Sequence, residues 1–476
     1  MDHLKQFYID GRWVEPIGQG SVEVINPATE KPVAEIALGD QRDVDAAVDA
    51  ARRAFPAFSQ TSVADRLALL HSILAEYERR AHDIAAAIVD EVGSPQAFAR
   101  NAQSAAGINQ LKEHIKALET FRFEETKGTT LILREAIGVV GLITPWNWPI
   151  NQLVAKVAPA IAAGCTMVVK PSELSPINTL IFAEVMHDAG VPAGVFNLVN
   201  GDGAVVGAAL ASHPDVDMVS FTGSTRAGAE VARAAAATVK RVAQELGGKA
   251  PTIMLPDADL DQTVKVAIQR IFSNSGQSCS APSRLLVPKD KVEHACAIAK
   301  GVADAVVVGD PTDAATTMGP VISRTQFEKI QDLIASGVQE GARLVCGGPG
   351  RPDGLDKGYF VQPTVFADVD PSMRIACEEI FGPVMSIIAY DDVDHAIMIA
   401  NDTPYGLSAY VQGADAEAAR NVARRLRAGQ VHINNPPMDR SAPFGGYKQS
   451  GNGRENGEHG ISEFLETKAL TGYAAA

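Results

Sequence analysis

The sequence predicts an α/β fold with two units, each a largely parallel β-sheet covered by helices. From Gly138 onward, short strands rich in β-branched residues alternate with amphipathic helices, and a second series of this kind follows the Gly-Gly pair at 247–248. This alternation is typical of parallel sheets with helices on both faces. A chain of 476 residues also has room for two or three domains.

The elements follow in order from the spacing of the apolar residues. Short strands and turns are predicted over residues 7–38, and a pair of strands over 131–143 is hinged at Gly138. Helices are predicted over 43–58, 66–92, 97–118, 151–163, 178–189, 205–212, 225–237, 260–274, 290–303, 324–339 and 415–428. Asp257 is the expected N-cap of the helix that ends near residue 274, and the C-terminal tail holds an expected edge strand.

Composition argues against several classes of function. The chain has 57 acidic and 42 basic residues, and its net charge of −15 disfavours binding to nucleic acid or to an anionic membrane. Five cysteines without a C-x-x-C pair predict neither a disulfide framework nor a thiolate metal site. No apolar run approaches the roughly 18 residues that a membrane span requires. We therefore expect a cytoplasmic protein.

Cys279 is the first candidate for chemistry. It lies in a polar turn, FSNSGQSCSAPSR (272–284), between a predicted helix and a predicted strand. A thiol in such a turn can meet a substrate and act as a nucleophile. A free cysteine is more often a buried and inert residue, so both interpretations stay open at this point.

Two further side chains have suitable settings for catalysis. Asn147 lies between two Trp and two Pro residues in PWNWP (145–149), which would hold its amide rigidly as a donor to an oxyanion. Glu245 precedes two glycines in ELGGK (245–249), and burial in a cleft would raise its pKa toward that of a general base. The alternatives are an Asn that satisfies its own turn and an ordinary surface Glu.

Strand ends supply candidates for cofactor binding. Lys170 and Glu173 follow a strand in KPSE (170–173), where they could hold ribose hydroxyls, and FTGST (221–225) opens a helix whose amides suit a pyrophosphate. A solvated Lys and a simple helix cap would explain the same residues. The glycines of GDGAVVG (201–207) are one residue off the dinucleotide-binding spacing, and we interpret them as a turn before a helix.

Seven motifs occur together in one order: PWNWP, KPSE, FTGST, ELGGK, GQSC (276–279), EEIFGP (378–383) and PFGGYKQSGNGRE (443–455). In these the chain resembles the NAD(P)-dependent aldehyde dehydrogenase superfamily, over residues 7 to 470. The resemblance implies a Rossmann-type cofactor domain, an α/β catalytic domain and a small β element for oligomerisation. The implied parts are an NAD-binding domain over 1–118 and 138–248, bridging strands over 119–137 and 463–476, a catalytic domain over 249–447 and a return segment over 448–462. A homodimer or homotetramer is expected, since an edge strand in the bridge would pair with a partner.

The resemblance also implies the chemistry. Cys279 would attack the aldehyde carbon, and the Asn147 side chain with the Cys279 amide would hold the oxyanion of the thiohemiacetal. Hydride transfer to the cofactor would leave a thioester, which water activated by Glu245 would hydrolyse. Relatives that pass the acyl group to coenzyme A lack this Glu, so a free acid is expected. Lys156 and Glu455 would relay the proton outward, or form a structural ion pair.

The cofactor residues that the resemblance implies are Trp146, Lys170, Ser172, Glu173, Gly223, Ser224, Gly247, Glu379 and Phe381. A carboxylate at position 173 would accept a free ribose 2′-hydroxyl and repel a 2′-phosphate. We therefore predict NAD, while Lys170 leaves NADP open.

The implied substrate tunnel is lined by Trp148, Gln152, Ala155, Ser278, Ser280, Met438 and Phe444. Many relatives that oxidise small aliphatic aldehydes carry aromatic residues where Ala155 and Met438 stand, so we predict a wider tunnel and a medium or bulky substrate, aromatic or long-chain. A semialdehyde whose carboxylate pairs with Arg440 is the alternative. A thiol hydrolase and a non-catalytic binding protein on the same scaffold are more remote ones.

Overall fold

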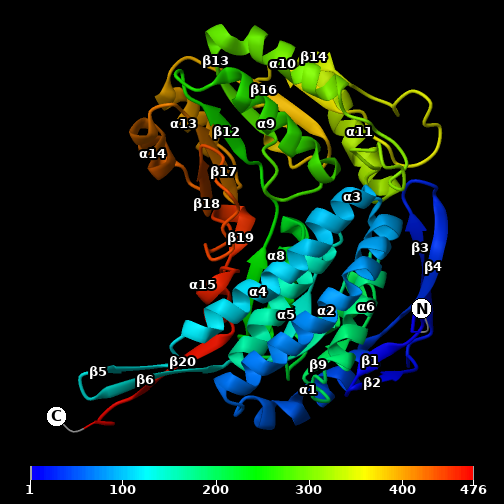
Figure 1. Cartoon of the computed structure of the whole chain (residues 1–476), viewed down its shortest axis with the longest axis vertical. Coiled ribbons are helices and arrows are strands. Elements are labelled where there is room, and N and C mark those ends of the chain that lie inside the picture. The colour runs from blue at the N-terminus through cyan, green and yellow to red at the C-terminus, as the bar shows by residue number, and fades with distance from the viewer. Residues whose placement is uncertain (1–2, 475–476) are drawn as a thin grey trace.

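The computed structural model describes residues 3–474, which form two lobes and a projecting arm (Figure 1). The lower lobe is built on an eight-stranded sheet in the order β19-β11-β10-β7-β8-β9-β1-β2. Its middle five strands are parallel, while β1, β2 and β19 run antiparallel to their neighbours. The strands are β19 Gly451–Asn452, β11 Arg241–Glu245, β10 Met218–Thr222, β7 Val139–Ile143, β8 Thr166–Lys170, β9 Phe196–Leu198, β1 Phe7–Ile9 and β2 Arg12–Val14.

Helices cover both faces of this sheet, as the alternating pattern predicts. They are α1 Gln41–Phe58, α2 Val63–Val92, α3 Gln96–Phe98, α4 Ala105–Thr120, α5 Pro149–Ala163, α6 Ile177–Asp188, α7 Ala208–Ser212, α8 Thr225–Ala235 and α15 Gly457–Glu463. Their ends follow from local chemistry. Asp40 and Ser62 form capping boxes before α1 and α2, and α5 begins at a proline and ends at Gly164 with φ +90°.

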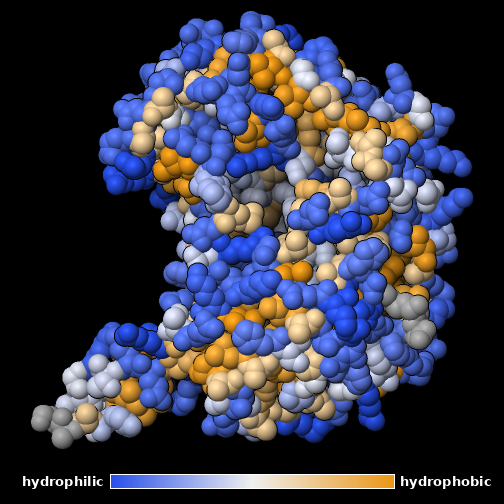
Figure 2. Space-filling view, viewed as in Figure 1, coloured by the Kyte–Doolittle hydropathy of each residue, from blue (hydrophilic) through white to orange (hydrophobic). Residues whose placement is uncertain are grey.

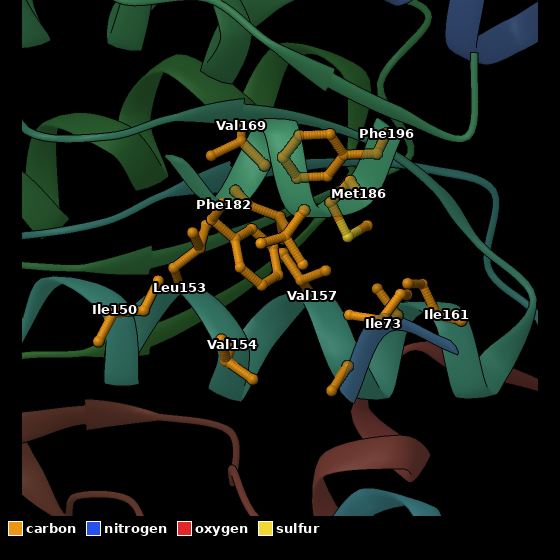
Figure 3. Packing of buried hydrophobic residues seen from close by; sticks show 14 of the residues in the cluster. Ile73, Ile150, Leu153, Val154, Val157, Ile161, Val169, Phe182, Met186 and Phe196 are labelled. Atoms are coloured by element: carbon orange, nitrogen blue, oxygen red, sulfur yellow. The ribbon is translucent and has the colours of Figure 1, made fainter. Parts of the chain in front are cut away.

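Helix α5 is central to the core of this lobe, and all but one of its residues are buried. Leu153, Val157 and Ile161 of α5 lie among side chains from α6, β8, β9 and α2 in one hydrophobic cluster, which Figure 3 shows from close by. A helix that is apolar on all sides needs cover on all sides. The loop before α5 is therefore anchored to a rigid element.

The upper lobe contains a seven-stranded sheet in the order β14-β15-β16-β13-β12-β17-β18, parallel apart from β14. Its strands are β14 Arg343–Cys346, β15 Thr364–Ala367, β16 Val384–Tyr390, β13 Arg284–Pro288, β12 Pro251–Met254, β17 Ser408–Gln412 and β18 Gln430–Ile433. Its helices are α9 Leu260–Phe272, α10 Val292–Asp304, α11 Arg324–Gln339, α12 Arg374–Cys377, α13 Val393–Asn401 and α14 Ala416–Arg425. The second α/β unit predicted after residue 248 is present.

The arm is a three-stranded antiparallel sheet of β20 Leu465–Leu470, β6 Thr130–Ala136 and β5 Glu124–Lys127. Its strands fall within the ranges predicted for the bridging strands, of which residues 475–476 lie outside the described part. A separate hairpin pairs β3 Gly20–Asn26 with β4 Lys31–Leu38. Within residues 3–474, no helix is long and apolar enough to cross a membrane.

Three local predictions differ from the structure. The helix expected over 97–118 is interrupted by a π-helical turn at Ala99–Ser104, which lies between α3 and α4. The strands on either side of Gly138 belong to different sheets rather than forming a pair. The N-cap of α9 is Asp259, which accepts from the Gln262 amide, whereas the Asp257 carboxylate accepts from the Asp415 amide at 2.7 Å. This last contact spans the lobe, so local pattern could not reveal it.

Candidate active site

A cleft of about 690 Å³, open to solvent, lies where the two lobes meet. Nine of the residues predicted from sequence line it: Trp146, Asn147, Gln152, Gly223, Ser224, Gly247, Cys279, Glu379 and Phe381. Eight of them come from the ends of strands in the lower sheet and from two loops of the upper lobe, and Gln152 comes from α5. The carboxyl edge of a parallel sheet is where ligands bind in open α/β folds, so the position agrees with that rule.

Cys279 follows a turn of unusual backbone conformation. After α9 the chain passes through three consecutive residues with positive φ: Asn274 at 52°, Ser275 at 55° and Gly276 at 75°. Two of these are not glycine, and such conformations persist only where surrounding contacts hold them. Ser275 Oγ donates to the Gly319 carbonyl at 2.8 Å, and Gln277 Oε1 accepts from the Ile322 amide at 2.9 Å. The turn is thus tied to its own lobe, and Cys279 is half-buried beyond it.

Asn147 joins this turn to the lower lobe. Its Nδ2 donates to the Gln277 carbonyl at 3.0 Å, while its own backbone carbonyl accepts from Gln103 Nε2 at 3.1 Å and from Asn274 Nδ2 at 2.9 Å. An amide nitrogen carries two hydrogens, so the second N–H of Nδ2 remains for a ligand in the cleft. The predicted alternative, an Asn that serves its own turn, does not describe these contacts, which reach distant segments.

Glu245 ends β11 and is buried, with an exposed fraction of 4%. Among the residues that the structure describes, neither of its carboxylate oxygens has a hydrogen-bond partner. Burial raises the pKa of Glu245 well above its ordinary value, and the nearby charge of Glu455 raises it further. A carboxyl group of this kind is suited to accept a proton and is costly to keep for stability alone.

The pKa of the Cys279 thiol is also raised, first by burial and then by the charges of Glu245 and Glu379. These effects favour the thiol over the thiolate in the free protein. Attack on a carbonyl requires the thiolate, so a proton must leave Sγ before or during that step.

Lys156, which is buried, and Glu455, which is half-buried, form an ion pair next to Glu245. Their Nζ and Oε1 atoms lie 2.5 Å apart, and Lys156 Nζ also donates to Ser220 Oγ at 3.0 Å. Ala155, Lys156, Glu245 and Glu455 line one small cavity of about 280 Å³. The structure therefore brings this pair together with Glu245, and places Ala155 in that cavity rather than in the cleft that holds Cys279.

The predicted cofactor residues fall into two groups. In the first, Lys170 at the end of β8 pairs with Glu173 at 3.0 Å, and Ser172 is buried with its Oγ accepting from the Leu174 amide. In the second, Ser224 caps α8 by accepting from the Ala227 amide at 3.3 Å, so the helix-cap interpretation also holds. Gly223 opens the turn beside this cap.

Glu379, Gly247 and Phe381 shape the opposite wall of the cleft. Glu379 accepts from the Gly248 amide at 2.8 Å, and a Cβ added at Gly247 would come within 2.8 Å of Glu379 Cδ. Only a glycine fits at position 247 while Glu379 stays in place. The Phe381 ring meets Trp146 edge-on with centroids 5.4 Å apart. The result is a narrow cradle between two aromatic rings and a buried carboxyl group.

Comparison with known proteins identifies the fold and the class of enzyme. The family model described as "Aldehyde dehydrogenase family" matches residues 13–470. The chain belongs to the aldehyde dehydrogenase family. It is 55% identical over 474 residues, 99% of each chain, to the 3-succinoylsemialdehyde-pyridine dehydrogenase of a Pseudomonas species. It is also 50% identical over 472 residues, again 99% of each chain, to a putative aldehyde dehydrogenase of Staphylococcus aureus.

Two solved structures show the same fold. A mutant of aldehyde dehydrogenase C from Pseudomonas syringae, complexed with NAD+ and octanal, is 54% identical with a TM-score of 0.99, covering 100% of this chain and 98% of that one. The Mycobacterium tuberculosis aldehyde dehydrogenase complexed with NAD+ is 40% identical with a TM-score of 0.96, covering 98% of both. The family and the fold class predicted from sequence are confirmed, and the protein is an aldehyde dehydrogenase.

The predicted substrate residues of this aldehyde dehydrogenase are spread over several places. Trp148 Nε1 donates to Ser278 Oγ at 2.7 Å, next to Cys279, and Gln152 lines the cleft. Phe444 pairs through its backbone with Glu455 at 2.9 and 2.7 Å. Met438, by contrast, is 77% exposed on the loop after β18.

Arg440 lies on the same loop and is half-buried, and burial lowers the pKa of its guanidinium. Within the described residues, no hydrogen bond or ion pair involves this side chain. A contact between Arg440 and a substrate stays a prediction.

Three residues that position the nucleophile were not anticipated. Gln103 and Asn274 reach Asn147, as described above. Tyr410 of β17 donates from its hydroxyl to the Ser280 carbonyl at 2.9 Å, and its ring lies between the Arg270 guanidinium and the stacked His432 ring. Neither a Gln in an Ala-rich helix nor a Tyr in a strand carries a sequence signal for such a role.

Proposed function

We propose that this aldehyde dehydrogenase oxidises an aldehyde to the free carboxylic acid with NAD, through covalent attachment of the substrate to Cys279. The observation that carries the proposal is that Cys279 and Asn147 share one cleft, while the charge of Glu245 acts on the Cys279 thiol from the adjoining cavity. Glu245 is a buried carboxyl group that has no hydrogen-bond partner in residues 3–474. A nucleophile, an amide donor and a free base are the parts that acyl chemistry requires.

In the first half-reaction, Sγ of Cys279 gives up its proton to water in the open cleft and, as the thiolate, bonds to the carbonyl carbon. The oxygen becomes an oxyanion, which the free N–H of Asn147 and the backbone amide of Cys279 stabilise. NAD, when bound, would supply the acceptor for the hydride of this carbon, which would leave the substrate as a thioester on Sγ of Cys279.

In the second half-reaction, Glu245 takes a proton from a water molecule as the oxygen of that water bonds to the thioester carbon. The C–S bond then breaks, which releases the acid and restores the thiolate. Lys156 and Glu455 lie in the cavity behind Glu245, so we propose that they carry its proton away from the site.

NAD fits the residues that are present. Gly223 and Ser224 offer a turn and a helix start for a pyrophosphate, and Trp146 with Phe381 offers an aromatic wall for a planar ring. Glu173 next to Lys170 suits ribose hydroxyls. The relatives complexed with NAD+ support NAD over NADP.

For the substrate, we propose a medium or bulky aldehyde, aromatic or long-chain. The names of the similar proteins support this class, because one acts on a pyridine semialdehyde and another was crystallised with octanal. A semialdehyde held by Arg440 is the second candidate, favoured by the half-buried, unpartnered guanidinium among the described residues.

The arm supports the predicted homodimer or homotetramer, because β20 and β5 are both edge strands and β20 is largely exposed. The domain ranges and the cytoplasmic location stay predictions.

The test is to follow the absorbance of reduced cofactor with NAD and, separately, NADP across acetaldehyde, hexanal, benzaldehyde and succinic semialdehyde. We expect a signal with NAD that disappears in Cys279→Ser, with kcat/KM higher for hexanal or benzaldehyde than for acetaldehyde. Hydrolysis of esters without any reduced cofactor would favour a thiol hydrolase. Absence of both activities would favour a non-catalytic binding protein.

A further inference from the structure

A separate cavity, smaller than the cleft of Cys279, lies in the upper lobe at the amino ends of the neighbouring strands β13, β12 and β17. It encloses about 270 Å³ including its mouth, and it shares no lining residue with that cleft. Lys249 before β12, Arg284 at the start of β13 and Ser408 at the start of β17 all line it. None of the roles proposed above uses this space.

Two polar side chains in the wall of this cavity are buried and lack a hydrogen-bond partner in the part of the chain that the structure describes. They are Lys249 at its Nζ atom and Ser408 at its Oγ atom, and each residue has an exposed fraction of 2%. Taking a polar group out of water without a compensating hydrogen bond is costly, and most costly for a charged group. A ligand that accepts hydrogen bonds from both atoms would offset this cost.

The charged side chains that line the cavity are all positive. They are Lys249, Arg284 and the exposed Arg427, and none of the fourteen lining residues, all of which lie within residues 3–474, is acidic. Among these residues, Arg284 is buried and donates to backbone carbonyls, including that of Lys249 at 3.0 Å. Three cations without a carboxylate, in a chain whose net charge is −15, indicate a site for an anion.

The mouth and the interior of the cavity limit the kind of anion. Arg427 lies at the exposed end, directly after α14, whose hydrophilic side chains cover this part of the surface (Figure 2). Most of the enclosed volume belongs to the mouth, and the interior has room for one body of about the size of a water molecule. A monatomic anion suits this interior, whereas phosphate or an organic acid is too large for it.

We propose that this cavity binds one chloride ion, which accepts hydrogen bonds from Lys249 Nζ and Ser408 Oγ beside the positive charge of Arg284. The site is distinct from the cleft of Cys279, and the proposal does not depend on the function proposed above. The ion replaces the partners that both buried groups lack among the described residues, so its binding stabilises the folded protein.

The segment that the ion stabilises joins the two lobes. Lys249 follows Gly248, whose amide donates to Glu379 at 2.8 Å. A Cβ added at Gly248 would lie 2.4 Å from the carbonyl oxygen of Cys279. An ion held by Lys249 therefore supports a segment that is packed against the nucleophile, while the ion itself contacts neither substrate nor cofactor.

Binding of the ion depends on pH, because Lys249 must be protonated to attract it. The pKa of Lys249 is lowered to about 7, first by burial and then by the charge of Arg284; the charges of Glu379 and Cys377 act in the opposite direction, and that of Lys329 lowers it further. The unfolded chain holds this proton more tightly, so without the ion the group lowers stability at and below about pH 7. An anion favours the protonated amine, and the gain in stability from chloride is therefore larger at pH 6 than at pH 9.

The experiment measures the Tm of the full-length enzyme at pH 6 and at pH 9 while sodium chloride replaces sodium gluconate at constant ionic strength. Gluconate is the reference because it is too large for the interior. We expect chloride to raise the Tm at pH 6 by about 2 °C or more along a saturating curve, and by less at pH 9. Lys249→Met removes the charge and keeps a long side chain, and it should abolish this response.

Lys240→Met is the matched control. Lys240 is half-buried and its pKa is lowered to about 8, mainly by burial, but it lies in the lower lobe and does not line the cavity. Its substitution should leave the chloride response unchanged. A response that persists in folded Lys249→Met would identify a general ionic effect and overturn the proposal.

Two further measurements keep the proposal testable if Lys249→Met does not fold. Ser408→Ala removes one hydrogen bond to the ion and should raise the chloride concentration at half-saturation by about fivefold. In crystals soaked in sodium bromide, an anomalous peak should lie next to Lys249 Nζ and Ser408 Oγ. An unchanged half-saturation, an absent peak, or a wild-type Tm that does not respond to chloride would each overturn the proposal and indicate a water molecule at this place.

Discussion

The two lobes contribute to the active site in different ways. The lower lobe places Lys170 and Glu245 at the ends of β8 and β11, where parallel pairing sets their positions residue by residue. The upper lobe places Cys279 on a loop with three consecutive left-handed residues. This loop depends on side-chain hydrogen bonds, and two of the donors to Asn147 come from opposite lobes.

The difference indicates which parts of the site keep their structure when a side chain is substituted. A strand end is held by a ladder of backbone hydrogen bonds, which a side-chain substitution does not remove. The Cys279 loop is held by a few amide side chains, so a single substitution can remove much of its support. Substitutions at strand ends should therefore change chemistry without a loss of stability, while those at the loop should lower activity and stability together.

The largest effect is expected for Glu245→Gln. Loss of a general base should lower the steady-state rate by about 10²–10⁴-fold, because the thioester forms but is hydrolysed slowly. Stopped-flow absorbance should therefore show one rapid burst of NADH followed by a slow phase. Absence of the burst would place Glu245 in the attack step instead.

The raised pKa of Glu245 predicts the sign of the pH dependence of both the rate and the stability. Since burial raises the pKa of Glu245, the rate of the wild-type second half-reaction should rise with pH through that raised pKa. The folded state holds the proton more tightly than the unfolded state, so the stability contributed by this group is present at low pH and is lost as pH rises. Glu245→Gln should therefore have a higher Tm than the wild type at pH 8, which a thermal scan will decide. A lower Tm for Glu245→Gln would contradict the expectation that substitutions at strand ends cause no loss of stability.

Asn274→Ala should lower both the stability of the protein and its activity. It removes donors to the carbonyls of Asn147 and Gln277, which are buried contacts, and should destabilise the protein by about 1–3 kcal/mol. Displacement of the Asn147 donor should lower kcat by about tenfold or more. Urea unfolding and steady-state kinetics measure the two effects, with Lys329→Ala, a cleft residue on α11, as the comparison variant. A loss of activity without any loss of stability would show that the loop does not need this support.

A smaller and purely chemical effect is expected for Glu173→Gln. Removing the carboxylate that pairs with Lys170 leaves a cation free to meet a 2′-phosphate, so the preference for NAD over NADP should fall by about tenfold. Values of kcat/KM for the two cofactors measure this shift, and the Tm should stay close to that of the wild type. If the preference does not move, Glu173 does not face the ribose.

The smallest effect is expected for Tyr410→Phe, which removes one hydroxyl from the Ser280 carbonyl and keeps the ring between Arg270 and His432. A single neutral hydrogen bond contributes about 1 kcal/mol, so alkylation of Cys279 by iodoacetamide should change by no more than about fivefold. The pH profile of that alkylation is the sensitive measurement. A profile identical to the wild type would remove Tyr410 from the residues that position the loop.

Much of this protein was determined by local sequence. Periodicity predicted α5, α6 and the alternation of strands and helices, because each apolar face must be buried whatever lies opposite. The seven motifs identified the family, since each sets a residue type at a turn or strand end where the backbone permits few alternatives. The local settings of Cys279, Asn147 and Glu245 at turns and strand ends are sufficient to predict all three as candidates for catalysis.

Tertiary structure alone decided the rest. Asp259 rather than Asp257 caps α9 because Asp257 has a partner 158 residues away, and the π-helical turn in the helix after Pro95 lies where Gln103 reaches Asn147. The lack of hydrogen-bond partners around Glu245 within residues 3–474 and the positions of Ala155 and Met438 were likewise set by the tertiary structure. Each depends on what distant segments bring or leave out, and periodicity and propensity describe only near neighbours along the chain.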